Sequence, residues 1–140
     1  VLDGDDSDVR IVLQNHMGSY TFAQGVQLTQ LTSRDRFGMC FSPDHCKLMK
    51  EDWDYAMSQA KEHSLQMYCS DVQWNEDGSH QGALPCEGGV DLAAAFQVIG
   101  GTDFDGWVSF KWEKIWQDQL VEPEIALPHF IKYYNEKMAV

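Results

Sequence analysis

The sequence predicts an α/β protein in which four parallel strands alternate with helices. Three observations carry this prediction. The 140 residues are 44% hydrophobic and 12% aromatic, which is enough apolar surface for a packed core and argues against disorder. Residues 106–114 alternate between apolar and polar side chains, with the period of two that is typical of a strand. Upstream, a short strand followed by a helical segment recurs, and this order indicates parallel strands joined by right-handed crossovers.

Four segments have the composition of strands, and they are residues 9–16, 38–42, 65–70 and 106–114. The first three are short apolar runs that end at polar residues or proline, as strands of a buried parallel sheet do. The fourth places Val108, Phe110 and Trp112 on one face and Ser109, Lys111 and Glu113 on the other. We expect helices to cover its apolar face.

Four segments are predicted to be helical, and they are residues 26–32, 51–63, 92–99 and 124–138. The second and third carry apolar side chains at helical spacing, and Asp91 is a suitable N-cap for the third. Pro128 is expected to kink the last helix or to mark its start. Residues 71–89 are polar and contain glycine, so we expect a loop there, of a length that is more often functional than idle.

Four β/α units are half of an eight-stranded barrel, which typically needs about 250 residues. We therefore expect residues 1–140 to form a single domain, the parallel (β/α)4 half of a TIM barrel. Alone, such a half leaves two strand edges and one face of the sheet uncovered. The chain would then be a fragment whose N-terminal half is missing, a homodimer that closes one barrel, or an open sheet. We favour a fragment by origin and self-association as its physical consequence.

Charge and cysteine content limit the partners and the location. Ten basic and 22 acidic residues give a formal net charge of −12, so we expect neither nucleic acid nor a membrane surface as a partner. No apolar run approaches the length of a membrane span, and the first residues lack the order of a signal peptide. Cys40, Cys46, Cys69 and Cys86 form no CxxC pair. Buried, reduced thiols in a cytoplasmic protein are the expectation.

Four motifs follow one another at the ends of the expected strands. They are Leu13-Gln14-Asn15-His16, Phe41-Ser42-Pro43-Asp44-His45, Tyr68-Cys69-Ser70-Asp71, and Phe104-Asp105-Gly106-Trp107-Val108-Ser109 with Trp112-Glu113-Lys114. In this order and spacing, the set resembles the sugar phosphate isomerase/epimerase family, the xylose isomerase-like TIM barrels that also include endonuclease IV. The resemblance covers nearly the whole chain and implies that its strands are strands five to eight of the barrel.

The resemblance also implies where a metal ion would be bound. The family holds a divalent ion with carboxylates from strands five, six and eight and a histidine from strand seven. Those positions fall on Gln14, Ser42, Lys111 and Tyr68 in this chain. An amide, two hydroxyls and an ammonium are poor ligands for such an ion, and the ammonium would repel it. We therefore expect no metal bound in the family's way and predict no cofactor.

Lys111 is the first candidate for chemistry. Its ammonium would supply the positive charge that the metal gives elsewhere, and would polarise a substrate carbonyl or, once deprotonated, form a Schiff base. The alternative is an ion pair with Glu113 or Asp71, which is a common arrangement without a catalytic role.

His16 and His45 stand where the family keeps histidine, so they are candidates for substrate contact or acid/base chemistry. Lone histidines are more often hydrogen-bonded residues of the surface or core. Glu113 is a candidate base or a partner of Lys111, and Asp71 and Asp44 would orient the histidines or cap the following helices. We expect four side chains to contact a substrate, and they are Gln14, Ser42, Tyr68 and Asp71.

Two classes of function remain open. The first is an enzyme of carbohydrate metabolism, a sugar or sugar phosphate isomerase, epimerase or related lyase that works without the usual metal. The second is a non-catalytic relative that binds a sugar-like ligand or serves as a structural subunit. Trp107, Trp112 and Trp116 are expected to be packing residues rather than platforms on which a sugar stacks.

Overall fold

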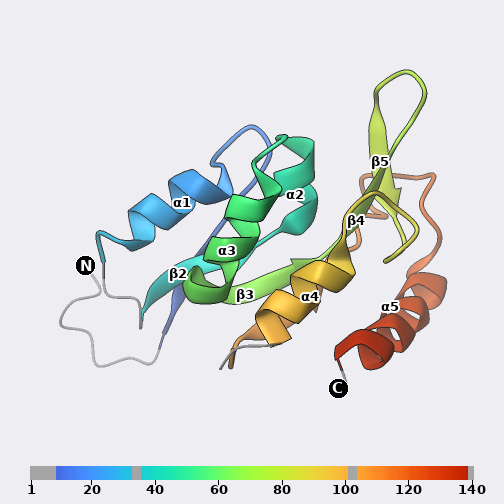
Figure 1. Ribbon diagram of the computed structural model, residues 1–140. Helices are drawn as coiled ribbons and strands as arrows, with labels where there is room; N and C mark the ends of the chain where they lie inside the picture. The colour runs from blue at the N-terminus through green and yellow to red at the C-terminus, as the bar shows by residue number, and fades with distance from the viewer. Residues whose placement is uncertain (1–8, 33–35, 101–103, 139–140) are drawn as a thin grey trace.

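The computed structural model describes residues 9–32, 36–100 and 104–138. Within these ranges, four parallel strands form one sheet in the order β1-β2-β3-β6 (Figure 1), which confirms the predicted α/β fold. The strands are β1 (Ile11–Gln14), β2 (Phe37–Phe41), β3 (Ser64–Cys69) and β6 (Trp107–Phe110). Because all four run the same way, their carboxyl ends meet at one edge of the sheet.

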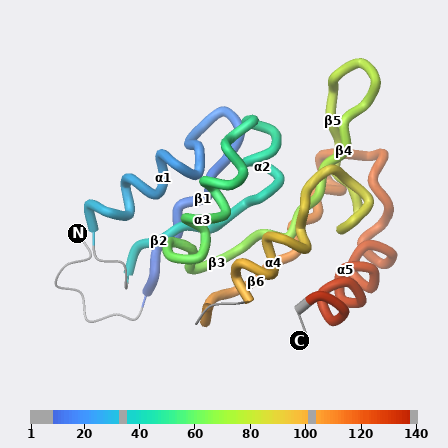
Figure 2. The backbone as a smooth tube through the Cα atoms, in the orientation of Figure 1, coloured from blue at the N-terminus to red at the C-terminus, as the bar shows by residue number. Residues whose placement is uncertain are grey.

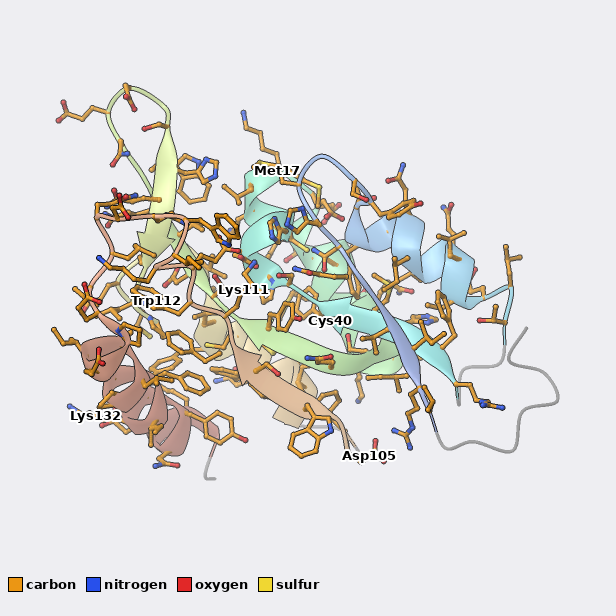
Figure 3. All side chains as sticks on the ribbon, turned by 180° about the vertical axis from the view of Figure 1, so that it is seen from behind. Met17, Cys40, Asp105, Lys111, Trp112 and Lys132 are labelled. Atoms are coloured by element: carbon orange, nitrogen blue, oxygen red, sulfur yellow. The ribbon has the colours of Figure 1, made fainter. Side chains whose placement is uncertain are left out.

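Helices cover one face of the sheet. They are α1 (Phe22–Thr29), α2 (Pro43–Leu48), α3 (Trp53–His63), α4 (Leu92–Gly100) and α5 (Pro123–Met138). Along the sheet, α1 contacts α3, α3 contacts α4, and α4 contacts α5 (Figure 2). The core lies between these helices and the strands, and its largest buried members include Phe22, Phe41, Met67 and Phe96. Seen from the opposite side, the described strands lie uncovered by helices, and both Cys40 on β2 and Lys111 directly after β6 are seen there (Figure 3).

α1 begins at Phe22, earlier than the expected residue 26, because Thr21 caps it. The Thr21 hydroxyl accepts the Gln24 N–H at 3.1 Å, and the Gln24 side chain accepts the Thr21 N–H at 3.0 Å. Gly25 lies inside this helix, and the space that a side chain at position 25 would need is occupied by the end of the Met39 side chain. A Cβ on Gly25 would lie 2.6 Å from the Met39 sulfur.

Pro43 begins α2 rather than only ending β2. Proline suits the first turn of a helix because its missing N–H would have no helical partner there. The short helix therefore starts directly at the carboxyl end of β2 and carries Asp44 and His45 with it. At the other end of the chain, Pro128 lies inside α5, so it does not mark the start of that helix.

The segment 71–89, which was expected to be a loop, contains an antiparallel hairpin of β4 (Asp71–Trp74) and β5 (His80–Ala83). Its turn is held by Asp77, whose carboxylate accepts the Ser79 N–H at 2.9 Å. The hairpin rises from the carboxyl edge of the sheet (Figure 1). The loop prediction is therefore wrong for these residues, and the hairpin becomes one wall of the candidate site.

β6 ends at Phe110, earlier than the predicted residue 114, although the Lys111 N–H still donates to the Cys69 carbonyl at 3.1 Å. Trp107 and Trp116 are each 80% exposed, so the expectation that they are packing residues is wrong. Trp112 does pack, with its ring stacked on that of Phe110. None of the helices in the described ranges has the length and apolar character that crossing a bilayer requires.

Candidate functional site

A cavity of about 230 Å³ lies at the carboxyl edge of the sheet. The segments after β1, β2 and β6 line it from one side, and the β4-β5 hairpin contributes Val72, His80 and Gly82 from the other. All four predicted catalytic side chains line this cavity, and they are His16, His45, Lys111 and Glu113. Sequence segments that are nearly 100 residues apart are thus brought together by the sheet order.

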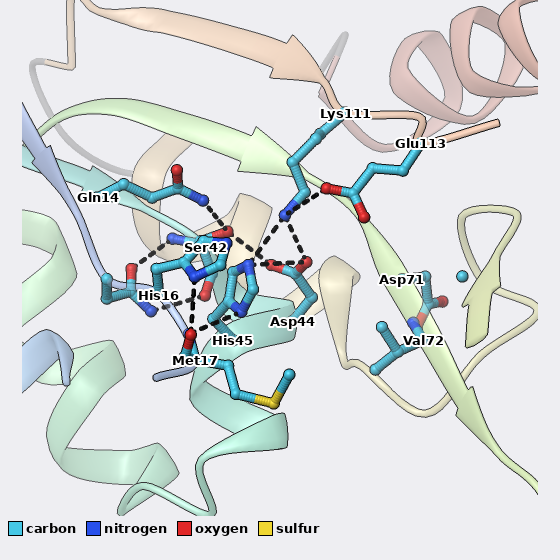
Figure 4. Close-up of polar contacts among 12 residues, drawn as sticks. Gln14, His16, Met17, Ser42, Asp44, His45, Asp71, Val72, Lys111 and Glu113 are labelled. Atoms are coloured by element: carbon cyan, nitrogen blue, oxygen red, sulfur yellow. Dashed lines mark hydrogen bonds and ion pairs between the residues drawn. The ribbon is translucent and has the colours of Figure 1, made fainter. Parts of the chain in front are cut away.

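Lys111 lies at the centre of this group (Figure 4). Its Nζ is 3.1 Å from Asp44 Oδ2, 3.0 Å from His45 Nε2 and 3.9 Å from Glu113 Oε1. The Lys111 side chain is 17% exposed and that of Asp44 only 3%. The predicted contact with Glu113 is present but long, and the alternative partner Asp71 is wrong. The main partner is Asp44, across the sheet on α2.

A chain of hydrogen bonds fixes Asp44. The Ser42 hydroxyl donates to Asp44 Oδ1 at 2.6 Å. Ser42 is itself held by the fully buried Asn15, whose amide donates to the Ser42 carbonyl at 2.9 Å and accepts the Ser42 N–H at 2.8 Å. Asn15 thus extends the pairing of β1 with β2 by one residue beyond the last backbone partners. The carboxylate beside Lys111 is therefore positioned by two neighbouring strands.

The charges of Asp44 and His45 follow from their surroundings. Burial alone would raise the pKa of the Asp44 carboxyl, but Lys111, His45 and the Ser42 hydroxyl together lower it, so the carboxyl is ionised. Burial lowers the pKa of His45 to about 4, with Lys111 and His16 acting in the same direction and Asp44 opposing them. His45 is therefore a neutral imidazole near pH 7.

The hydrogen bonds of His45 decide what the site can do with a proton. The Met17 N–H donates to His45 Nδ1 at 3.1 Å, so the neutral ring carries its proton on Nε2. That nitrogen faces Lys111 Nζ at 3.0 Å. Two donors do not bond to each other, so in this tautomer the contact is a close approach of the ammonium to the ring and not a hydrogen bond. Both groups are therefore donors at the cavity wall.

The residues predicted to contact substrate are placed differently. Gln14, Ser42 and Tyr68 lie behind the Lys111 group: the Gln14 amide donates to the Ser42 hydroxyl at 3.4 Å, and the Tyr68 ring centre is 5.9 Å from Lys111 Nζ. Asp71 lies apart from them (Figure 4). Its buried carboxylate accepts four backbone N–H groups of the segment 72–90. None of these four residues lines the cavity.

Three contributors were not singled out from the sequence. Asp44 was considered only as a cap or a support for the histidines, Asn15 was quoted within a motif without a role, and His80 lies in the hairpin that was expected to be a loop. The signal for Asn15 was its position directly after a strand, one residue before His16. For His80, no periodic pattern in the sequence marked the strand.

The donor set does not fit a divalent metal ion. At the positions where the family's ligands fall, the structure places an amide, a hydroxyl, a phenol and an ammonium, and the ammonium of Lys111 already neutralises the nearest carboxylate. Among the residues that the structure describes, no group of three or more His, Cys, Asp or Glu side chains is arranged to hold a metal ion. No step is therefore assigned to a metal.

The parallel α/β sheet and the polar cluster at the carboxyl ends of its strands define the chain as TIM-barrel-like. A model of the xylose isomerase-like TIM barrel family matches residues 4–130, and the chain belongs to this family. No curated protein sequence matches the chain.

Two solved structures share the fold. A xylose isomerase domain protein from Planctomyces limnophilus superimposes with a TM-score of 0.67 at 14% identity, over 94% of this chain and 47% of that one. An IOLI protein with a bound zinc atom superimposes with a TM-score of 0.68 at 20% identity, over 94% of this chain and 49% of that one. The chain therefore spans about half the length of these two proteins.

Proposed function

We propose that the chain supplies strands five to eight of a xylose isomerase-like barrel and binds a small sugar or sugar phosphate in the cavity at the sheet edge. The proposed activity is that of an isomerase or epimerase that works without a metal. One observation carries this proposal: Lys111 Nζ lies at the cavity wall, within 3.1 Å of both Asp44 and His45. A fixed cation thus stands where the family's metal ligands converge.

The cavity suggests a division of roles. The Lys111 ammonium polarises the carbonyl oxygen of the substrate and stabilises the negative charge that develops on it. Glu113, whose side chain is 42% exposed at the cavity, removes the proton from the adjacent carbon. Return of that proton to the carbonyl carbon, while the hydroxyl proton passes to the former carbonyl oxygen, gives isomerisation. Protonation of the first carbon on its other face, by an acid on the side opposite to Glu113, gives epimerisation. The neutral His45 holds or supplies the proton of the oxygen.

Proton exchange with solvent tests this mechanism directly. Aldoses, ketoses and their monophosphates are incubated with the protein in D2O and EDTA, and loss of the C–H signal beside the carbonyl is followed by NMR. We expect exchange in EDTA, and a decrease of about 10²–10⁴-fold in Glu113→Gln, because removing a general base typically has this effect. Glu136→Gln, on the exposed surface of α5, is the matched control and should exchange normally.

The outcomes separate the two classes of function. Exchange that disappears on adding EDTA would contradict the metal-free mechanism. Exchange that persists in Glu113→Gln would show that Glu113 is not the base. Saturable binding of a sugar without any exchange would assign the chain to the non-catalytic class and overturn the enzymatic proposal.

We also propose that two copies of the chain associate. β1 and β6 are the outer strands of the described sheet, and Ile11 on β1 is 43% exposed. On β6, Val108 packs against the core, so the 80% exposed Trp107 points to the face without helices. A second copy would cover both features by supplying the other four strands of a barrel.

Sedimentation velocity tests this association. We expect a dimer whose population rises with salt, because a formal charge of −12 per chain opposes self-association and salt screens that repulsion. Trp107→Glu should shift the equilibrium toward monomer, whereas the equally exposed Trp116→Glu, which lies outside the strands, should shift it less. A monomer at high concentration in both low and high salt would refute the dimer.

A further inference from the structure

A second cavity, of about 340 Å³, lies between the turn that follows β5 and one side of α5. It shares no lining residue with the cavity at the sheet edge, so it is a separate site. The lining residues that matter here are Cys86 in the turn and His129, Lys132, Tyr133 and Lys137 on α5. Its volume falls within the roughly 300–1,000 Å³ of sites that hold small molecules.

Cys86 differs from the other cysteines of the chain. Cys40, Cys46 and Cys69 are buried, whereas Cys86 is exposed and carries a free thiol. Its backbone adopts a φ of +72°, because its N–H is directed to Asp71 Oδ2 at 3.1 Å. Glycine adopts this conformation at lower free energy than any residue with a Cβ. A thiol is therefore present where the backbone alone favours glycine.

The Tyr133 hydroxyl is a donor without an acceptor in the same cavity. Tyr133 is only 6% exposed, and among the described residues no acceptor stands in good hydrogen-bonding geometry to its hydroxyl, although the Cys86 thiol lies beside it. Burial raises the pKa of Tyr133, and the neighbouring Cys86 thiol raises it further. The phenol therefore keeps its proton at neutral pH. A buried hydroxyl of this kind gains its missing hydrogen bond when an acceptor enters the cavity or when a neighbouring group becomes an anion.

The charges around this cavity admit an anionic ligand. Lys132 and Lys137 stand on α5, and Glu87 and Glu136 balance them, on a chain whose formal charge is −12. His129 ties the two walls together, because its Nε2–H donates to the Pro85 carbonyl at 2.9 Å. This rim is therefore less repulsive to carboxylates than the rest of the acidic chain.

We propose that Cys86 is a site of reversible S-thiolation by a small disulfide that carries carboxylates, such as glutathione disulfide. The Cys86 thiolate attacks one sulfur of the small disulfide, so that a bond from Sγ to that sulfur forms while the original S–S bond breaks. The departing thiolate takes up the proton that Cys86 released. Tyr133 donates a hydrogen bond to the Cys86 thiolate, and Lys132 and Lys137 attract the carboxylates of the incoming disulfide.

Native mass spectrometry with peptide mapping tests the site. The full chain is incubated with glutathione disulfide under native conditions, and one mixed disulfide is expected, at Cys86, which a reducing thiol removes. Cys40, Cys46 and Cys69 serve as controls within the same molecule because they are buried. Absence of label at Cys86, or equal labelling of the buried cysteines in the folded protein, would overturn the proposal.

Tyr133→Phe tests the role of the cavity. This change removes a buried hydroxyl without a partner, so the fold should be as stable as before or more so. The rate of thiolation should nevertheless fall about threefold, because the hydrogen bond that stabilises the attacking thiolate is lost. Tyr134→Phe is the matched control, and a rate equal to the parent's in Tyr133→Phe refutes the cavity's role.

Discussion

Asp71→Asn is expected to lower the free energy of unfolding by about 3 kcal/mol. The Asp71 carboxylate is almost fully buried and accepts four backbone N–H groups. Its Oδ1 accepts those of Val72 and Val90 at 2.8 and 2.9 Å, and its Oδ2 those of Cys86 and Gly88 at 3.1 and 3.0 Å. An amide of the same shape presents a donor to two of these donors and leaves them unsatisfied.

Asp77→Asn is the matched control for this change. Asp77 also accepts a backbone N–H, that of Ser79, but it lies fully exposed in the turn of the hairpin, where water replaces the lost bond. Little change in stability is therefore expected. Urea denaturation followed by tryptophan fluorescence measures both variants. A midpoint for Asp71→Asn equal to that of Asp77→Asn would show that the segment 72–90 does not depend on the carboxylate.

Burial raises the pKa of Asp71, and the four backbone N–H donors oppose that rise without cancelling it. The carboxylate joins the start of β4 to the turn that precedes α4. A Cβ on Gly88 would collide with the Asp71 carboxylate, so the turn depends on glycine as well as on the acid. Both features lie at the base of the hairpin that forms one wall of the candidate site.

The parallel sheet and its helices were predictable because their signals are local. The helical spacing of residues 51–63 and the capping role of Asp91, which accepts the Ala94 N–H at 3.0 Å, agree with the structure. The position of Lys111 at the end of its strand was predictable for the same reason, since period-two alternation fixes which side chains share a face. These features need no knowledge of tertiary contacts.

The hairpin and the partner of Lys111 were not predictable in this way. Residues 71–74 and 80–83 pair through backbone hydrogen bonds. The first run alternates polar and apolar side chains for only four residues, and the second does not alternate at all. Asp44 reaches Lys111 only because β3 lies between β2 and β6, and that order is a property of the assembled sheet. The local sequence patterns predicted that Asp44 and Lys111 lie at strand ends, but they did not predict that these two side chains form an ion pair.

Lys111→Met is expected to destabilise the fold by about 3 kcal/mol and to abolish proton exchange. The substitution keeps the length of the side chain but removes the cation 3.1 Å from Asp44, whose side chain is 3% exposed. The Ser42 hydroxyl remains as a donor to the carboxylate, yet it supplies no charge. Lys132→Met is the control, because that lysine is 78% exposed and should contribute no more than about 0.5 kcal/mol.

The double variant Asp44→Asn/Lys111→Met separates the structural role of Lys111 from its chemical one. With both charges removed, no uncompensated charge is buried, so urea denaturation should recover most of the lost stability. Exchange should stay absent, because the cation that polarises the substrate carbonyl is still missing. Full exchange in the stable double variant would instead show that Lys111 serves only as the ion-pair partner of Asp44. The proposed mechanism would then need another group to polarise the substrate carbonyl.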